Sequence, residues 1–234
     1  MKQVWYADDA TGAGTCEGLR QWWEHVELLG PTFGYYPNSV KTYLVVKEEH
    51  EHKAKVLFAD TNAHVTINGK SHLGAALGAK SFTEEYVSSK VTKWTKEIIQ
   101  LSMIPLLNPH AAYAAFTHGL SNHWLHTSRT IPDIQHLLLP LETAIHQHFI
   151  PALTRREPCS MAERDLLALP VRLGGMGLVN PVSDSPYAFE GSKHITAPFV
   201  VLIIMHTGSP PDCAVERPSK REKLFEEAEK GDTK

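Results

Sequence analysis

The chain opens with an apolar, aromatic run that leads to two adjacent carboxylates and is followed at once by a second β-prone run. The whole segment is Lys2–Gly12, and the carboxylates are Asp8 and Asp9. Because Asp tolerates the bend of a tight turn, the pattern predicts a β-hairpin with both carboxylates at or beside the turn. Two carboxylates on a rigid hairpin suit a hard divalent cation such as Mg²⁺. The hairpin tip is therefore the first candidate for a chemical site.

Four segments in a fixed order resemble motifs of one enzyme family. Tyr6-Ala7-Asp8-Asp9 resembles the signature hairpin of reverse transcriptases. Gly34–Thr42 resembles the next motif, an Asn followed by Lys-Thr, and Ser71–Gly78 resembles the Leu-Gly hairpin that grips the primer. Leu169–Leu178 resembles a segment found downstream of the polymerase in some retroelement proteins. The resemblance is to a retrotransposon reverse transcriptase and covers about residues 2–180.

The resemblance implies an α+β fold with four parts. Residues 1–80 would be the C-terminal part of the polymerase palm, a β-hairpin and a small antiparallel sheet with helices. Residues 81–154 would form a mostly α-helical, thumb-like region. Residues 155–207 would be a helical extension with a Gly-rich turn, and residues 208–234 a charged tail.

The same resemblance implies an RNA-directed DNA polymerase that transfers nucleotides with two Mg²⁺ (or Mn²⁺) ions. Asp8 would be a direct metal ligand, and Asp9 a second ligand or an orienting group. Lys41 would protonate the pyrophosphate leaving group, since an ammonium stabilises a developing negative charge. Tyr6 would support the hairpin and face the primer end. The partner would be an RNA/DNA primer-template duplex.

The resemblance also implies contacts to nucleic acid outside the hairpin. His72, Leu73 and Gly74 form the centre of the Leu-Gly motif, where glycine permits close approach of a backbone.

From Thr83 the apolar residues recur at helical spacing, which predicts one buried helix face: Val87, Val91, Trp94, Ile98 and Leu101.

Three lysines, Lys90, Lys93 and Lys96, lie on a neighbouring slanting stripe of this predicted helix. In a thumb this stripe would contact duplex phosphates. A solvated helix face is the alternative reading of the three lysines.

One departure from the family pattern decides what activity we expect. The family needs another Asp on a neighbouring palm strand upstream of this hairpin. Only seven residues precede Asp8, which is enough for one strand at roughly 3.3 Å per residue. We therefore expect the fingers and the first half of the palm to be absent and the chain alone to be inactive. The incomplete palm should expose an apolar sheet edge through which the chain associates.

Two hypotheses compete with the polymerase fragment. One is a repurposed nucleic-acid-binding or interaction module that keeps the thumb helices without catalysis. The other is an unrelated α+β domain with a coincidental Tyr-x-Asp-Asp, in which Lys41 is an ordinary surface lysine. Geometry separates the last hypothesis from the others, because it does not require a hairpin at Asp8 and Asp9 or a nearby Lys41.

Composition limits the class of protein further. The formal net charge of −3 does not indicate a strong nucleic-acid binder, although local basic patches matter more than the total. Cys16, Cys159 and Cys213 are far apart and fit a reducing compartment. No signal peptide is evident, and the longest apolar run, Phe199–Met205, is too short to cross a bilayer. We expect an intracellular protein, cytoplasmic or nuclear, that is not secreted and has no membrane partner.

Local signals give three further expectations. Asn68-Gly69 is the strongest short hairpin signal in the chain. Gly119 is expected to end the helix that Asn108 caps and Pro109 opens. A buried helix, or alternatively a strand, is expected over Phe199–Met205. The scattered histidines of the helical region have no cysteine or acidic partner at metal-ligand spacing, so they do not predict a zinc site.

Overall fold

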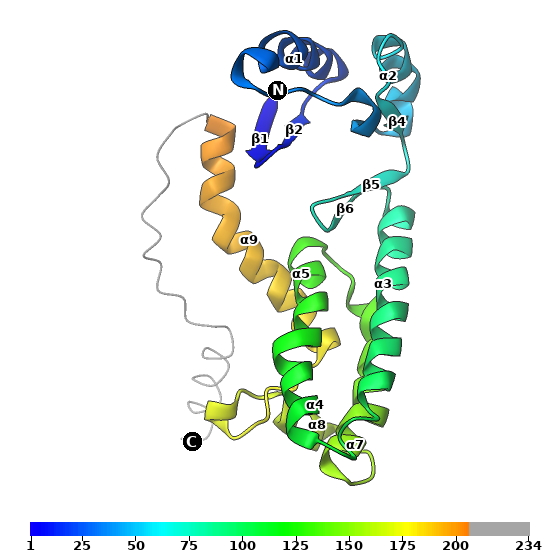
Figure 1. The fold of residues 1–234 in the computed structure, drawn as a ribbon, viewed down its shortest axis with the longest axis vertical. Coiled ribbons are helices and arrows are strands. Elements are labelled where there is room, and N and C mark those ends of the chain that lie inside the picture. The colour runs from blue at the N-terminus through cyan, green and yellow to red at the C-terminus, as the bar shows by residue number, and fades with distance from the viewer. Residues whose placement is uncertain (206–234) are drawn as a thin grey trace, which may run out of the picture.

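The computed structural model describes residues 1–205, and helices predominate in it (Figure 1). The predicted tail at 208–234 and the end of the predicted extension lie outside these residues. The strands form three separate two-stranded sheets rather than the single small antiparallel sheet that the sequence suggested. The α+β class is confirmed, and the assignment of the sheets to a polymerase palm stays a prediction.

The N-terminal hairpin forms as predicted. Strands β1 (Lys2–Tyr6) and β2 (Asp9–Ala13) pair antiparallel, with Tyr6 opposite Asp9, which leaves Ala7 and Asp8 as the turn. Helix α1 (Cys16–Leu29) follows, and the Thr15 hydroxyl accepts a hydrogen bond from the Gly18 N–H at 3.2 Å. A hydroxyl at the N-cap satisfies one of the N–H groups that a helix start leaves unpaired.

The second sheet is parallel. Strands β3 (Tyr43–Val45) and β4 (His64–Thr66) pair in parallel, and α2 (Glu51–Leu57) supplies the crossover that such a pair requires. Ala54 of α2 is fully buried and Phe58 nearly so. Ala54 and Phe58, the residue that follows α2, therefore mark the side of this segment that faces inward.

The third sheet corrects the prediction at Asn68-Gly69. Strands β5 (Gly69–His72) and β6 (Ala75–Gly78) form the hairpin, and its turn is Leu73-Gly74, with φ of 48° and 80°. Two positive φ values are typical of a type I′ turn. The Asn-Gly signal failed because β4 pairs with β3 instead of with β5.

The helical region contains the main hydrophobic core. Helix α3 (Lys80–Leu101) buries every residue of the predicted apolar stripe. Helix α4 (Pro109–Ala114) is capped by Asn108, whose Oδ1 accepts from the Ala111 N–H at 3.0 Å. The core of described residues runs from α3 to Leu178.

The expected helix end at Gly119 is wrong. A wide π-helical turn, Ala115–Leu120, carries α4 into α5 (Ser121–Thr130). Glycine within a helix costs about 1 kcal/mol, and the burial of Phe116 and Trp124 on either side of it compensates. The helix ends instead before Pro132, where Ile131 is extended, as residues before proline usually are.

Helices α6 (Leu139–Ala144) and α7 (Ile150–Thr154) are likewise joined by a π-helical turn, and α8 (Met161–Ala168) follows a Ser160 capping box. Arg164 of α8 is completely buried. Its guanidinium donates to both carboxylate oxygens of Glu142 at 2.6 and 2.8 Å, and to the Leu178 and Val179 carbonyls at 2.6 and 3.3 Å. This one side chain therefore joins α8, α6 and the irregular segment that follows the Gly-rich turn.

Helix α9 (Pro181–Met205) differs from the prediction. It begins at Pro181, well before the expected segment Phe199–Met205, and the Asn180 side chain caps its start by accepting from the Val182 N–H at 3.0 Å. Its apolar end, Phe199–Met205, is largely exposed instead of buried. By length and composition α9 would be able to cross a membrane, which is weak evidence, since core helices of soluble proteins pass the same test.

The buried pair generates a stability prediction. Arg164→Ala leaves the Glu142 carboxylate buried without its partner, and breaking a buried pair costs about 3–5 kcal/mol. Urea unfolding followed by circular dichroism measures this loss. The matched control is Arg156→Ala, because Arg156 pairs with Glu163 on the surface and exposed pairs contribute about 0–1 kcal/mol. Equal losses in the two variants would contradict the assigned role of Arg164.

Candidate functional site

The hairpin tip presents two carboxylates to solvent. Asp8 lies in the turn and Asp9 is the first residue of β2, and both are exposed. Within residues 1–205 neither carboxylate takes part in a hydrogen bond or an ion pair with another side chain. The tip is held by Ala7, which has a φ of 54° as two-residue hairpin turns require. Both oxygens of each carboxylate are therefore free to bind an external cation.

Two carboxylates alone make a weak metal site. Mg²⁺ takes six oxygen ligands in near-octahedral geometry and usually combines one or two carboxylates with waters and substrate phosphates. Among the residues that the structure describes, no group of three His, Cys, Asp or Glu side chains is placed to hold a metal. Asp8 and Asp9 would supply the one or two carboxylates of such a site, and its remaining ligands would have to come from other groups.

Tyr35 belongs to the hairpin tip, and the sequence analysis missed it. Its ring meets the Trp5 ring edge-on, with centroids 4.9 Å apart and planes at 74°. Partial burial raises the pKa of Tyr35, and the negative charges of Asp9 and Asp8 raise this pKa further. The tyrosine ring therefore contacts β1 through Trp5, and its hydroxyl is influenced by the charge of both carboxylates. The only sequence signal was its place in the Gly34–Thr42 motif.

Lys41 is not brought into contact with the carboxylates. It ends a short 3₁₀ turn, Ser39–Lys41, whose start is capped by Asn38: the side-chain Oδ1 accepts from the Lys41 N–H at 3.3 Å. The lysine is exposed, and no ion pair joins it to Asp8 or Asp9 in this part of the chain. Its predicted role toward a leaving group stays a prediction.

The predicted nucleic-acid contacts Tyr6 and His72 differ in availability. The Tyr6 side chain is 68% exposed beside the turn, so it is free to contact a ligand. His72 is half-buried, and its Nε2 lies 3.0 Å from the Thr11 hydroxyl of β2. This hydrogen bond joins the first hairpin to the third sheet, which gives His72 a structural role in holding the two hairpins together.

The Leu73-Gly74 turn contacts the helical region. The Gly74 carbonyl accepts a hydrogen bond from the Tyr86 hydroxyl of α3 at 2.8 Å. A Cβ at Gly74 would lie 3.0 Å from the His126 ring of α5, so glycine is also needed for this close approach. Leu73 itself is half exposed. The turn is thus fixed between the N-terminal sheets and the helices, with one apolar side chain left available.

The three lysines of α3 are not equivalent. The Lys90 ammonium lies 4.9 Å from the centroid of the Tyr86 ring and 5.8 Å from that of the Trp94 ring, where cation–π attraction holds it. Lys93 pairs with Glu97 at 3.8 Å. Lys96 is exposed and makes no ion pair within residues 1–205. Of the three lysines, Lys96 is therefore the one whose charge is most available to an external ligand.

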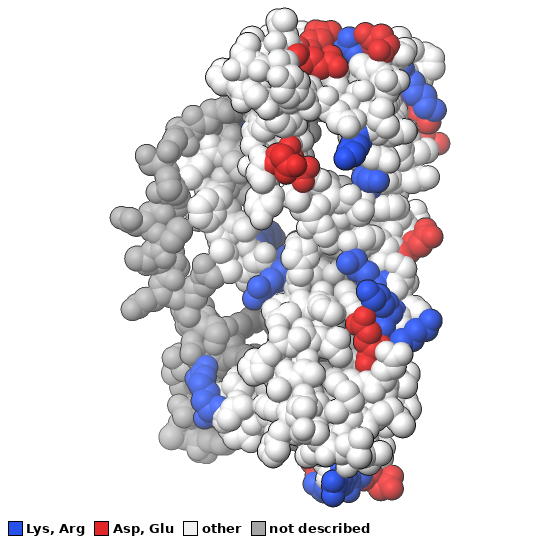
Figure 2. Space-filling view, viewed as in Figure 1, with Lys and Arg blue, Asp and Glu red and all other residues white. Residues whose placement is uncertain are grey.

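Basic side chains lie along the α3 side of the face shown in Figure 2, and acidic ones mark the N-terminal end of the same face. Lys70 of β5, which the sequence analysis did not single out, adds a further cation whose ammonium lies 3.7 Å from the Tyr43 ring. Glu97 moderates the positive charge of α3, since it faces both Lys93 and His123. The face is mixed in charge, in keeping with the net charge of the chain.

Comparisons with known proteins add no family: no family model, no curated protein and no solved structure matches this chain.

The placement of Tyr35 gives a prediction about proton binding. Asp9→Asn removes the negative charge that, of the two carboxylates, raises the pKa of Tyr35 more, so this pKa should fall toward the ordinary value of about 10. The measurement is the tyrosinate absorbance during an alkaline titration, taken as the difference between each protein and its Tyr35→Phe counterpart. Asp133→Asn, an exposed change in the helical region, is the control and should leave this pKa unchanged. An identical Tyr35 titration in Asp9→Asn and in the original chain would refute the placement.

Proposed function

We propose that this chain is the C-terminal palm and thumb portion of a retroelement reverse transcriptase, an RNA-directed DNA polymerase. The observation that carries the proposal is the Tyr6–Asp9 hairpin with two exposed, unpaired carboxylates at its turn. Two further features support it. The Leu73-Gly74 hairpin also forms, and it lies against the lysine-bearing helix α3 through the Tyr86 hydroxyl.

In the complete enzyme the reaction joins a primer 3′-oxygen to the α-phosphorus of a nucleotide and releases pyrophosphate. Bound Mg²⁺ ions would lower the pKa of the attacking hydroxyl and stabilise the charge on the leaving oxygen. Asp8 and Asp9 would hold these ions, and Tyr6 would contact the primer end beside them. Lys41 would donate a proton to the pyrophosphate if the bound nucleotide lies between it and the hairpin.

The geometry of the tip explains why we expect the isolated chain to be inactive. No third acidic side chain stands with Asp8 and Asp9 in the described structure. Mg²⁺ gives up its bound water reluctantly, so two solvent-exposed carboxylates alone bind it weakly. In the family a further Asp on a neighbouring strand completes the site, so catalysis should require a segment that supplies it.

A primer-extension assay tests this expectation. The purified chain, given an RNA template, a DNA primer, nucleotides and either Mg²⁺ or Mn²⁺, should give no template-dependent product. An Asp8→Asn, Asp9→Asn double variant is the control for contaminating polymerase, because it removes both predicted ligands. Extension by the original chain that disappears in the double variant would show that the site is complete and that our expectation is wrong.

A second candidate function is a nucleic-acid-binding module without catalysis. The observation that favours it is a difference between the hairpin tip and α3. In the described residues no third metal ligand stands beside Asp8 and Asp9, whereas on α3 Lys96 makes no ion pair and Lys90 is held over aromatic rings. Such a module needs the α3 face and does not need Asp8 or Asp9.

Duplex binding across a salt titration tests the nucleic-acid interface that both functions share. Affinity for an RNA–DNA duplex should fall steeply with salt, because phosphate contacts release counterions. Lys96→Glu should weaken binding most and reduce the salt slope by about 1. Lys93→Glu should have a smaller effect, since Lys93 is already paired with Glu97. The control is Lys47→Glu on the surface of the N-terminal part, and binding that responds equally to Lys47→Glu and Lys96→Glu would exclude α3 as the interface.

A further inference from the structure

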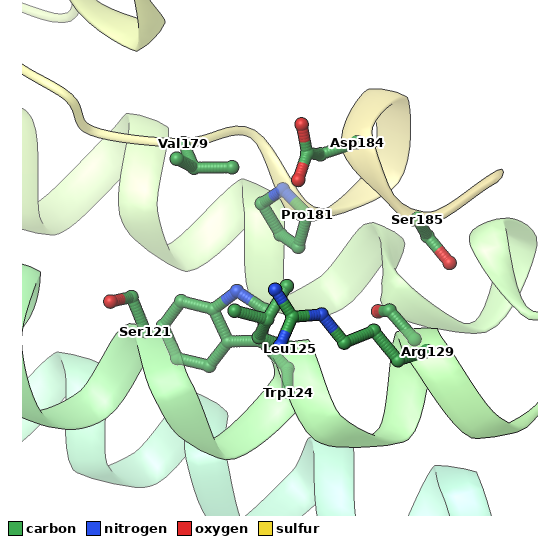
Figure 3. Close-up of a pocket in the computed structure, with 9 residues that line it drawn as sticks. Ser121, Trp124, Leu125, Arg129, Val179, Pro181, Asp184 and Ser185 are labelled. Carbon is green, nitrogen blue, oxygen red and sulfur yellow. The ribbon is translucent and has the colours of Figure 1, made fainter. Parts of the chain in front are cut away.

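A pocket of about 250 Å³ lies between α5 and the start of α9, away from the hairpin tip. Figure 3 shows that α5 forms one wall with Trp124, Leu125 and Arg129, and that Pro181 and Asp184 face them from the other side. The buried Arg164 guanidinium donates a hydrogen bond to the Val179 carbonyl. This bond holds the segment that leads into α9, and with it the α9 side of the pocket, in position. The pocket is therefore formed by rigid elements on both sides.

Several hydrogen-bond donors that line the pocket have no partner in the described protein. Ser128 and Ser185 are each only 3% exposed, and neither hydroxyl takes part in a hydrogen bond. The indole N–H of buried Trp124 also has no acceptor among these residues. These three atoms are not among the described side-chain atoms that are both shut off from solvent and unpaired, so they open onto the pocket, where a ligand or solvent completes them.

The charge at the pocket points to the kind of ligand. Arg129 contributes a guanidinium that makes no ion pair within residues 1–205, and none joins it to Asp184 across the pocket. The N–H groups at the start of α9 are not the donors in question, since Asn180 already accepts from Val182 and Ser183. The donors at the pocket are thus one cation, two hydroxyls and one indole N–H, with the Asp184 carboxylate on the facing wall, and oxyanions are the ligands that such donors bind best.

The rest of the pocket lining is apolar. Leu125, Val179 and Pro181, together with the face of the Trp124 ring, offer a surface for a flat or aliphatic body. A volume of about 250 Å³ lies below the range of about 300–1,000 Å³ that is typical of drug-sized ligands, so the ligand must be small.

We propose that this pocket binds a small molecule that carries an oxyanion, either a carboxylate on an apolar body or a free phosphate. Arg129 pairs with the oxyanion, and the Ser128 and Ser185 hydroxyls and the Trp124 indole donate to its oxygens or to polar atoms beside them. The proposal does not depend on the reverse-transcriptase assignment, since none of these residues belongs to the hairpin tip or to α3.

The test follows the Trp124 indole N–H by ¹H–¹⁵N NMR in the full chain, with the resonance assigned through Trp124→Phe. Three probes are titrated separately: benzoate, inorganic phosphate and benzamide, the uncharged counterpart of benzoate. We expect a saturable shift with at least one anion and a much weaker one with benzamide. Saturation by benzoate alone identifies an organic carboxylate as the ligand class, and saturation by phosphate alone identifies a free phosphate.

Variants separate this site from a general effect of charge. Arg129→Gln should weaken anion binding about tenfold or more, the size of effect that losing one charge-assisted hydrogen bond produces. Ser128→Ala and Ser185→Ala should weaken it less and should fold normally, because each removes a hydroxyl that has no hydrogen-bond partner within residues 1–205. Arg155→Gln, an exposed change outside the pocket, is the matched control. The proposal is overturned if neither anion saturates the shift, if benzamide matches benzoate, or if Arg129→Gln binds as tightly as Arg155→Gln.

Discussion

The ion pair between Arg164 and Glu142 is the interaction on which the arrangement of the helical region depends. A fully buried guanidinium is tolerated only when its donors are satisfied, and here a carboxylate and two backbone carbonyls satisfy them. The carbonyls belong to Leu178 and Val179, in the segment that leads through Asn180 into α9. The pair therefore decides where α9 leaves the helical core, and with it the wall that α9 contributes to the pocket against α5.

The position of the hairpin tip depends on the same helices through a short series of contacts. The N-terminal part buries few apolar side chains of its own, chiefly Cys16, Trp23, Ala54 and Phe58. Hydrogen bonds join its hairpins to one another and to the helices: Thr11 of β2 pairs with His72 of β5, and the Gly74 carbonyl accepts from the Tyr86 hydroxyl of α3. The Lys2 ammonium also donates to the Ile204 carbonyl of α9. Meanwhile Val4, Trp5 and Tyr6 of β1 stay exposed, and within the described residues β1 pairs with β2 alone. An unpaired apolar edge of this kind is suited to receiving a further strand, as the polymerase proposal requires.

Local patterns predicted the elements whose causes are local. The apolar stripe of α3 follows from the helical period, the Asn108 cap satisfies a neighbouring N–H group, and the Asp8-Asp9 hairpin follows from one turn. The failures had distant causes. Asn68-Gly69 is no hairpin turn because β4 found β3 as its partner, and Gly119 lies inside a helix because buried aromatic residues flank it. Of the candidate site, the tip residues were predicted, whereas Tyr35 reaches the tip from another segment, and the α5–α9 pocket arises only when two distant helices pack together.

The central claim, that the hairpin of Asp8 and Asp9 is a metal-binding tip facing a nucleic-acid duplex, is tested most directly by Mn²⁺ broadening of amide NMR signals. The chain saturated with an RNA–DNA duplex would receive substoichiometric Mn²⁺, and signals near the ion would broaden. The account predicts broadening of the Ala7, Asp8 and Asp9 amides that is lost in an Asp8→Asn, Asp9→Asn double variant. Glu48 and Glu49, an exposed acidic pair elsewhere on the surface, provide the internal comparison. Broadening at those glutamates alone, or broadening at the tip that survives the double substitution, would contradict the account.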